Sequence, residues 1–111
     1  MGVRLILKEG ELTAVLSGEI DHHSAREIRE TIDDAASKVK PKLLTLDFSD
    51  IQFMDSSGIG LIMGRCKLMQ VWGGAVRIAN LPPKIEKIVS LSGINQLCTV
   101  VKGVKKDEAD E

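Results

Sequence analysis

Short aliphatic runs alternate with helical segments along the whole chain, and this order constrains the fold more than any other feature of the sequence. Two β-prone runs, Val3–Lys8 and Leu12–Ser17, flank the turn sequence Glu9-Gly10-Glu11 and predict a hairpin. A helix, strand, helix, strand, helix and strand follow in that order. Because strands joined by helices run parallel, we expect an α/β fold. It should have a mixed sheet of about four to five strands, with an antiparallel first strand and helices packed against it.

Capping residues, prolines and glycines set the expected boundaries of these elements. Ser24 and Glu27 form the S-x-x-E pattern of a capping box, which starts the first helix. Pro82 and Pro83 suit the first turn of the third helix, and Gly93 is its expected end. The expected helices span 24–39, 57–70 and 82–93, and the later strands span 43–48, 75–79 and 96–101, with a loop at 49–55.

The composition is that of one globular domain, which we place at residues 1–102, followed by a charged tail at 103–111 that we expect to be disordered. The chain has 15 basic and 16 acidic residues, a net charge of -1 and only 3% aromatic residues. This balance gives no support for nucleic acid or an anionic membrane as the main partner. No run reaches the ~20 apolar residues of a membrane span, and the N-terminus lacks the apolar region of a signal peptide.

Cysteine usage indicates a reducing compartment. Cys66 and Cys98 lie far apart and form no CxxC pair, so we expect two buried free thiols in a cytoplasmic protein. The same spacing argues against a zinc site. The sequence has no P-loop or glycine-rich nucleotide motif, and we expect no cofactor.

The triplet Asp55-Ser56-Ser57 stands where an apolar run gives way to the second helix. Asp and Ser are good N-caps because their side-chain oxygens accept hydrogen bonds from unpaired N–H groups, but capping does not use all three side chains. At least one hydroxyl is therefore left for another role. A phosphate on it would add about -1.5 to -2 charges at the positive end of the helix dipole. The domain would tolerate that charge, whereas a partner docking over it would have to desolvate it.

The second helix is apolar on two sides when its residues are placed at about 100° intervals. One side is the expected core face, and the other is either covered by the domain itself or available to a partner. Gly58, Gly60 and Gly64 allow either close packing on the helix's own sheet or close approach by a partner. The expected core face is Ile59, Ile62, Met63, Cys66 and Gln70, and the opposite face is Leu61, Gly64 and Leu68.

Four uses of the stretch Asp21-His22-His23 come into consideration. In a serine hydrolase, Ser56 or Ser57 would be the nucleophile and a histidine the base, but the G-x-S-x-G elbow is absent. A metal site would need a further His or Cys ligand at useful spacing, which the sequence lacks. Otherwise Asp21 caps its loop, or the loop borders the serine site as a recognition surface. Both loops leave the carboxyl ends of strands, so we expect them to be neighbours in space.

Two stretches, GEIDHHSA at 18–25 and LDFSDIQFMDSSGIGLIMGRCK at 46–67, resemble the STAS-domain anti-sigma factor antagonists, especially the sporulation anti-anti-sigma factors. The resemblance extends from the first hairpin to about Val101. It implies a STAS fold, which is a mixed sheet with helices packed against it. Cys66 stands where relatives often have an aromatic residue.

The resemblance implies a cytoplasmic regulator and not an enzyme. Such a protein binds an anti-sigma factor, itself a serine kinase that supplies the ATP site, and thereby releases a sigma factor. The kinase phosphorylates the serine that corresponds to Ser56, the phosphorylated form dissociates, and a serine phosphatase restores it. An antagonist in a general stress circuit is the alternative within this class. The implied partner-binding and phosphosite-neighbouring residues are Asp21, His22, His23, Asp55, Ser57, Gly58, Ile59, Gly60, Leu61 and Gly64.

Overall fold

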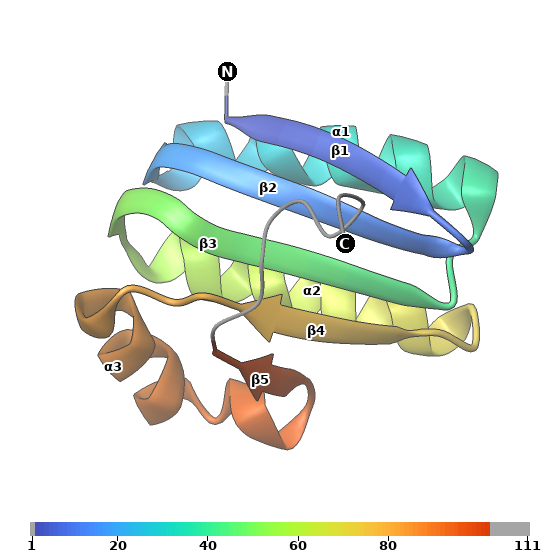
Figure 1. Ribbon diagram of the computed structural model, residues 1–111. Coiled ribbons are helices and arrows are strands. Elements are labelled where there is room, and N and C mark those ends of the chain that lie inside the picture. Colours follow the sequence, from blue (N-terminus) through green and yellow to red (C-terminus); the bar gives the residue numbers. More distant parts are fainter. Residues whose placement is uncertain (1, 103–111) are drawn as a thin grey trace.

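A five-stranded sheet organises the molecule, and the computed structural model describes residues 2–102 of the chain (Figure 1). The strands stand in the sheet in sequence order and are β1 (Val3–Lys8), β2 (Glu11–Ile20), β3 (Leu43–Met54), β4 (Ala75–Ala79) and β5 (Thr99–Val101). β1 pairs antiparallel with β2, and the remaining neighbours pair in parallel. The predicted mixed sheet with an antiparallel first strand is therefore confirmed. The tail expected at 103–111 lies outside the described residues.

Helices connect the parallel strands of this sheet. The described helices are α1 (His22–Val39), α2 (Ser56–Val71), α3 (Pro83–Ser92) and the short 3-10 helix η1 (Ile94–Gln96). α1 and α2 pack side by side on one face of the sheet, with α1 behind β1 and β2 and α2 behind β3 and β4 (Figure 1). Because β2 leads into α1 and β3 leads into α2, both helices start at the same edge of the sheet.

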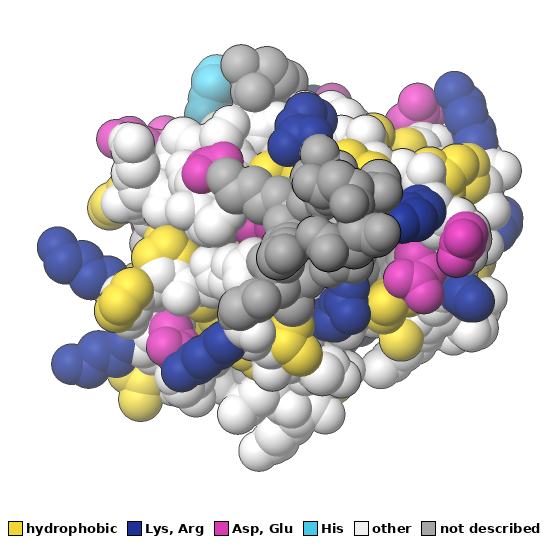
Figure 2. Space-filling view, in the orientation of Figure 1, with side chains coloured by type: hydrophobic (Ala, Val, Ile, Leu, Met, Phe, Trp, Pro, Cys, Tyr) yellow, Lys and Arg dark blue, Asp and Glu magenta, His cyan; other side chains and the backbone are white. Residues whose placement is uncertain are grey.

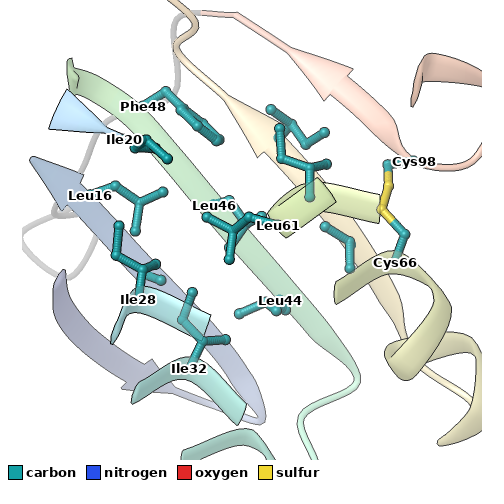
Figure 3. Packing of buried hydrophobic residues seen from close by; sticks show 14 of the residues in the cluster. Leu16, Ile20, Ile28, Ile32, Leu44, Leu46, Phe48, Leu61, Cys66 and Cys98 are labelled. Carbon is teal, nitrogen blue, oxygen red and sulfur yellow. A yellow bond between two sulfur atoms is a disulfide. The ribbon is translucent and has the colours of Figure 1, made fainter. Parts of the chain in front are cut away.

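The hydrophobic core lies between the sheet and the helices α1 and α2. Leu16 and Ile20 of β2 belong to one cluster with Ile28 and Ile32 of α1 (Figure 3). Burial of each such side chain contributes roughly 1.5–3 kcal/mol, so this cluster holds α1 on the sheet. The face of the molecule away from these two helices carries dispersed charged side chains with smaller hydrophobic patches between them (Figure 2).

The centre of β3 is buried at every position from Leu44 to Phe48, as expected for an interior strand. This segment includes a charged residue, Asp47, whose carboxylate accepts hydrogen bonds from the Ser49 N–H (2.9 Å) and from Asn80 Nδ2 (3.2 Å). Burying a charge is costly unless hydrogen bonds replace its water. The Asp47 network therefore allows a carboxylate in a strand that is otherwise mostly apolar.

The expected strands differ from the observed ones in two parts of the sheet. The segment expected as a loop at 49–55 continues β3 as far as Met54, because it pairs with an equally extended β2 through register shifts near Gly18. The last strand starts at Thr99 and not at position 96. The N–H groups of Leu97 and Cys98 donate to the Ile94 carbonyl, which makes this part of the chain a helical turn.

The expectation of two free thiols is also wrong, because Cys66 and Cys98 form a disulfide (Figure 3). Cys66 lies on α2 and Cys98 directly precedes β5, and their Cα atoms are 6.4 Å apart. Residues separated by 32 positions in the sequence can still be neighbours in the fold. Here the packing of α2 near η1 brings the two cysteines together. Cysteine usage consequently gives no argument for a reducing compartment.

Candidate functional site

The start of α2 presents one serine to solvent. Asp55 is the N-cap, and its Oδ1 accepts a hydrogen bond from the Ser57 N–H at 2.8 Å. Ser56 is the first residue of the helix and is exposed, whereas Ser57 is half-buried. Ser56 Oγ makes no hydrogen bond to any other residue within 2–102. The cap therefore uses the aspartate and leaves the Ser56 hydroxyl accessible.

Asp21 performs the same task at the start of α1. Its Oδ1 accepts hydrogen bonds from the N–H groups of His23 (3.0 Å) and Ser24 (2.9 Å), while the Asp21 N–H donates to Ser24 Oγ (3.0 Å). The predicted capping box of Ser24 and Glu27 is therefore wrong, since the box is formed one turn earlier and the helix begins at His22. The Ser24 N–H is the main cause that holds the pKa of Asp21 below its usual value of 3.8.

The histidine loop (Asp21-His22-His23) and the serine loop (Asp55-Ser56-Ser57) are neighbours in space, as expected from the order of the strands. Ile20 pairs with Met54 in the sheet, and the Asp55 N–H donates to the Ile20 carbonyl at 3.0 Å. His22 and Ser57, one from each helix start, line the same groove. His22 and His23 are both exposed, with their rings edge to face at 6.0 Å. The structure thus joins the histidine loop and the serine loop into one surface.

The predicted faces of α2 are partly wrong. Ile62 and Cys66 are buried as expected, but Ile59 and Met63 are only half-buried and Gln70 is exposed. Leu61, assigned to the outer face, is only 4% exposed. The cause is α1, which packs beside α2 and covers one of its flanks. The buried residues of α2 are Gly58, Leu61, Ile62, Arg65, Cys66 and Met69.

The three glycines of α2 have different surroundings. A Cβ at Gly58 would overlap the side chain of Met54, so this glycine serves the packing of the helix on its own sheet. A Cβ at Gly60 or Gly64 would meet no atom within 4 Å. Glycine costs about 1 kcal/mol relative to alanine inside a helix. The internal packing of the domain explains that cost at Gly58 and leaves it unexplained at Gly60 and Gly64.

Gly60 and Gly64 line a groove between α1 and α2 with a volume of about 640 Å³. Three arginines also line it: Arg26 and Arg29 from α1, and Arg65 from α2. The sequence did not single out these arginines, because Arg26 and Arg29 belong to a charge-rich stretch that looks like a solvated helix face and Arg65 stands alone in a largely apolar stretch. Their spacing gave no signal, since only the pairing of α1 with α2 brings them to one groove.

Arg65 links the two helices that form the groove. Its Nε lies 2.9 Å from Asp33 Oδ1, and its side chain is 7% exposed. The contact is an ion pair without a well-aligned hydrogen bond, and Arg65 Nη1 is buried with no partner among the described residues. Burial raises the pKa of Asp33, and the charges of Arg65 and Arg29 oppose that shift. Arg65 is therefore paired with Asp33 but keeps an unsatisfied N–H donor, Nη1, beside the groove.

Other kinds of site find little support in the described residues. Within 2–102, no group of three or more His, Cys, Asp or Glu side chains is arranged to hold a metal ion. The Asp21 carboxylate caps α1. No helix in the same part of the chain is both long and apolar enough to cross a membrane.

Comparison with known proteins identifies the family. The STAS domain family matches residues 5–107. The chain belongs to the STAS domain family. An anti-sigma F factor antagonist of Paenibacillus polymyxa is 34% identical over 91 residues, which cover 82% of this chain and 78% of the relative. An anti-sigma F factor antagonist of Lysinibacillus sphaericus is 33% identical, covering 71% and 68% of the two chains. An anti-sigma-B factor antagonist of Bacillus subtilis is 26% identical, covering 83% of each.

Solved STAS structures share the fold. The anti-sigma factor antagonist SpoIIAA in its unphosphorylated form has a TM-score of 0.82 at 27% identity, covering 97% of this chain and 93% of that one. The phosphorylated form of the Bacillus cell fate determinant SpoIIAA has a TM-score of 0.76, also at 27% identity, covering 97% and 96%. The predicted STAS fold and the predicted resemblance to anti-sigma factor antagonists are both confirmed.

Proposed function

We propose that the chain is an anti-sigma factor antagonist whose binding to its anti-sigma factor is switched off by phosphorylation of Ser56. The observation that carries this proposal is the exposed Ser56 hydroxyl at the start of α2, beside an aspartate that already caps the helix. The relatives support it, because they are anti-sigma factor antagonists and SpoIIAA is known in phosphorylated and unphosphorylated forms. These relatives are regulators and not enzymes.

The switch works through charge and needs no change of fold. A phosphate on Ser56 would lie at the N-terminus of α2, where free N–H groups and the helix dipole favour an anion. A partner that covered this surface would bury the phosphate next to Asp55. Leaving a buried charge unpaired costs about 3–5 kcal/mol, which weakens binding by roughly a hundredfold or more.

The partners follow from the same proposal. The anti-sigma factor is a serine kinase that brings the ATP site, and a serine phosphatase returns the antagonist to its active form. Both act in the cytoplasm. The docking surface comprises the two helix starts, with Asp21 beside the modified serine, and the higher identity to the sigma F antagonists favours a sporulation circuit over a general stress circuit.

The test is phosphorylation by an anti-sigma kinase with ATP, followed by intact-mass measurement and peptide mapping. We expect one phosphoryl group on the wild type and on Ser57→Ala, and none on Ser56→Ala. Unmodified Ser56→Ala should still bind the kinase. Stoichiometric phosphorylation of Ser56→Ala would show that the assigned serine is wrong. Affinities for a sigma F-type and a sigma B-type anti-sigma factor would separate the two circuits.

A further inference from the structure

The groove between α1 and α2 adjoins the proposed phosphorylation site and extends away from it between the two helices. Ser57 lines the groove at the start of α2, and Gly60 and Gly64 continue along the same helix. These two glycines are one helical turn apart, and neither has a neighbour within 4 Å of an added Cβ. Glycine lowers helix stability, so its presence at two positions without an internal packing role points to close approach by another chain.

The charge of the groove indicates the chemistry of the chain that would approach it. Arg26, Arg29 and Arg65 line it together with His22, and no Asp or Glu among the described residues does. Arg26 and Arg29 both face Glu30, at 3.4 Å and 4.0 Å, through exposed contacts that provide little neutralisation. Arg65 is nearly buried and pairs with Asp33 at 2.9 Å, while its Nη1 atom has no hydrogen-bond partner within 2–102. Within residues 2–102 the three arginines share two acidic partners, Glu30 and Asp33, so an incoming carboxylate would balance the remaining positive charge.

We propose that the groove between α1 and α2 binds an acidic segment of the anti-sigma factor. The backbone of that segment lies against Gly60 and Gly64, and its carboxylates face Arg26, Arg29 and Arg65. This inference rests on the proposed function, and it names the partner's chemistry and a second contact surface. The groove is continuous with the surface around Ser56, because Ser57 belongs to both. A phosphate on Ser56 then adds negative charge at the end of a site for a negatively charged segment, so phosphorylation weakens this contact through like-charge repulsion.

The test measures the affinity of the full chain for the purified anti-sigma kinase by titration calorimetry. Arg26→Glu reverses one charge of the groove, and Lys67→Glu reverses an exposed charge of α2 outside it. We expect Arg26→Glu to weaken binding by about tenfold at low salt, with a smaller effect at high salt, and Lys67→Glu to change it by less than about twofold. Gly64→Gln fills the groove, and we expect it to weaken binding by about tenfold while the melting temperature stays the same or rises.

The outcomes separate this inference from the proposed function. If the wild type binds the kinase and the Arg26→Glu and Gly64→Gln variants bind it equally well, the proposed role of the groove is wrong. The proposed function remains intact in that case. A wild type that binds no anti-sigma factor would overturn both. If Gly64→Gln lowers the melting temperature, Arg26→Glu decides the question. Another outcome is that Arg26→Glu abolishes binding of ADP or inorganic phosphate and leaves the affinity for the kinase unchanged. That result would assign the groove to a small anion and overturn the proposal that a protein segment binds there.

Discussion

Gly58 and Gly60 are two residues apart on α2, yet the fold uses them in opposite ways. Gly58 is buried against Met54, and Gly60 is open to the groove. The sequence left both packing and partner approach open for these glycines, and each explanation fits one of them. The surroundings therefore decide what a helical glycine does, since the residue type alone only permits a close approach to its backbone.

Alanine at these two positions should have opposite effects on stability. Gly60→Ala should raise the free energy of unfolding by about 1 kcal/mol, because it removes a helix-breaking residue without a clash. Gly58→Ala should lower it by about 1–2 kcal/mol, because its Cβ displaces Met54. Urea denaturation of the two variants checks this contrast. Equal effects in the same direction would contradict the assigned packing.

The cap at Asp21 should make stability depend on acid pH. Because the folded-state pKa of Asp21 lies below its usual value of 3.8, the ionised cap stabilises the fold above that pH. This contribution is lost as the pH falls through the folded-state pKa. Carbon NMR should place the titration of the Asp21 carboxyl below 3.8, and Asp21→Asn should lose less stability than the wild type on acidification. A titration midpoint above 3.8 would contradict the prediction.

At the scale of elements, α2 is held on three sides. It packs on the sheet, it contacts α1 through the ion pair of Arg65 with Asp33, and the disulfide of Cys66 with Cys98 ties it to the segment before β5. β5 has only three residues at the edge of the sheet. The covalent link therefore fixes the weakest strand to the helix that carries the proposed phosphorylation site.

Reduction of the disulfide should destabilise the domain without unfolding it. The bond closes a loop with a sequence separation of 32, for which chain entropy predicts a contribution of about 3–4 kcal/mol. Thermal denaturation with and without a phosphine reductant measures this difference. A Cys66→Ala/Cys98→Ala double variant is the control, because the reductant should not change its melting temperature. Equal melting temperatures for the oxidised and reduced wild type would contradict a bond that stabilises the fold.

At the scale of the whole molecule, the proposed switch changes the surface and preserves the fold. Ser56 is exposed and is not a member of the core cluster that the described residues form, and both forms of SpoIIAA resemble this chain over 97% of its length. A rigid domain can act in this way because only the partner has to desolvate the added charge.

Phosphorylated protein should therefore keep its circular dichroism spectrum and melt within a few degrees of the unmodified protein. Its affinity for the anti-sigma factor should fall by roughly a hundredfold or more, with Ser56→Asp falling less because it carries less charge. Spectroscopy and calorimetry on the same samples measure both effects. A large loss of structure on phosphorylation would contradict a switch that acts through charge alone.

The sequence by itself determined the order of the elements, the mixed sheet and the meeting of the Asp21 and Ser56 loops. The order of the elements follows from local periodicity and from caps and breakers, which act over a few neighbouring residues, and the other two follow from the geometry of strands joined by helices. The long strands β2 and β3 were predicted too short, because their pairing with one another extends them beyond their hydrophobic runs.

Only the tertiary structure decided which flank of α2 is buried, that the two cysteines are bonded, and that Arg26, Arg29 and Arg65 line one groove. Each of these depends on which element lies beside another, and helical periodicity gives the faces of a helix without saying what covers them. The placement of α1 beside α2 buries Leu61, pairs Arg65 with Asp33 and forms the groove. That placement results from the packing of both helices on one sheet, and no local signal in the sequence encodes it.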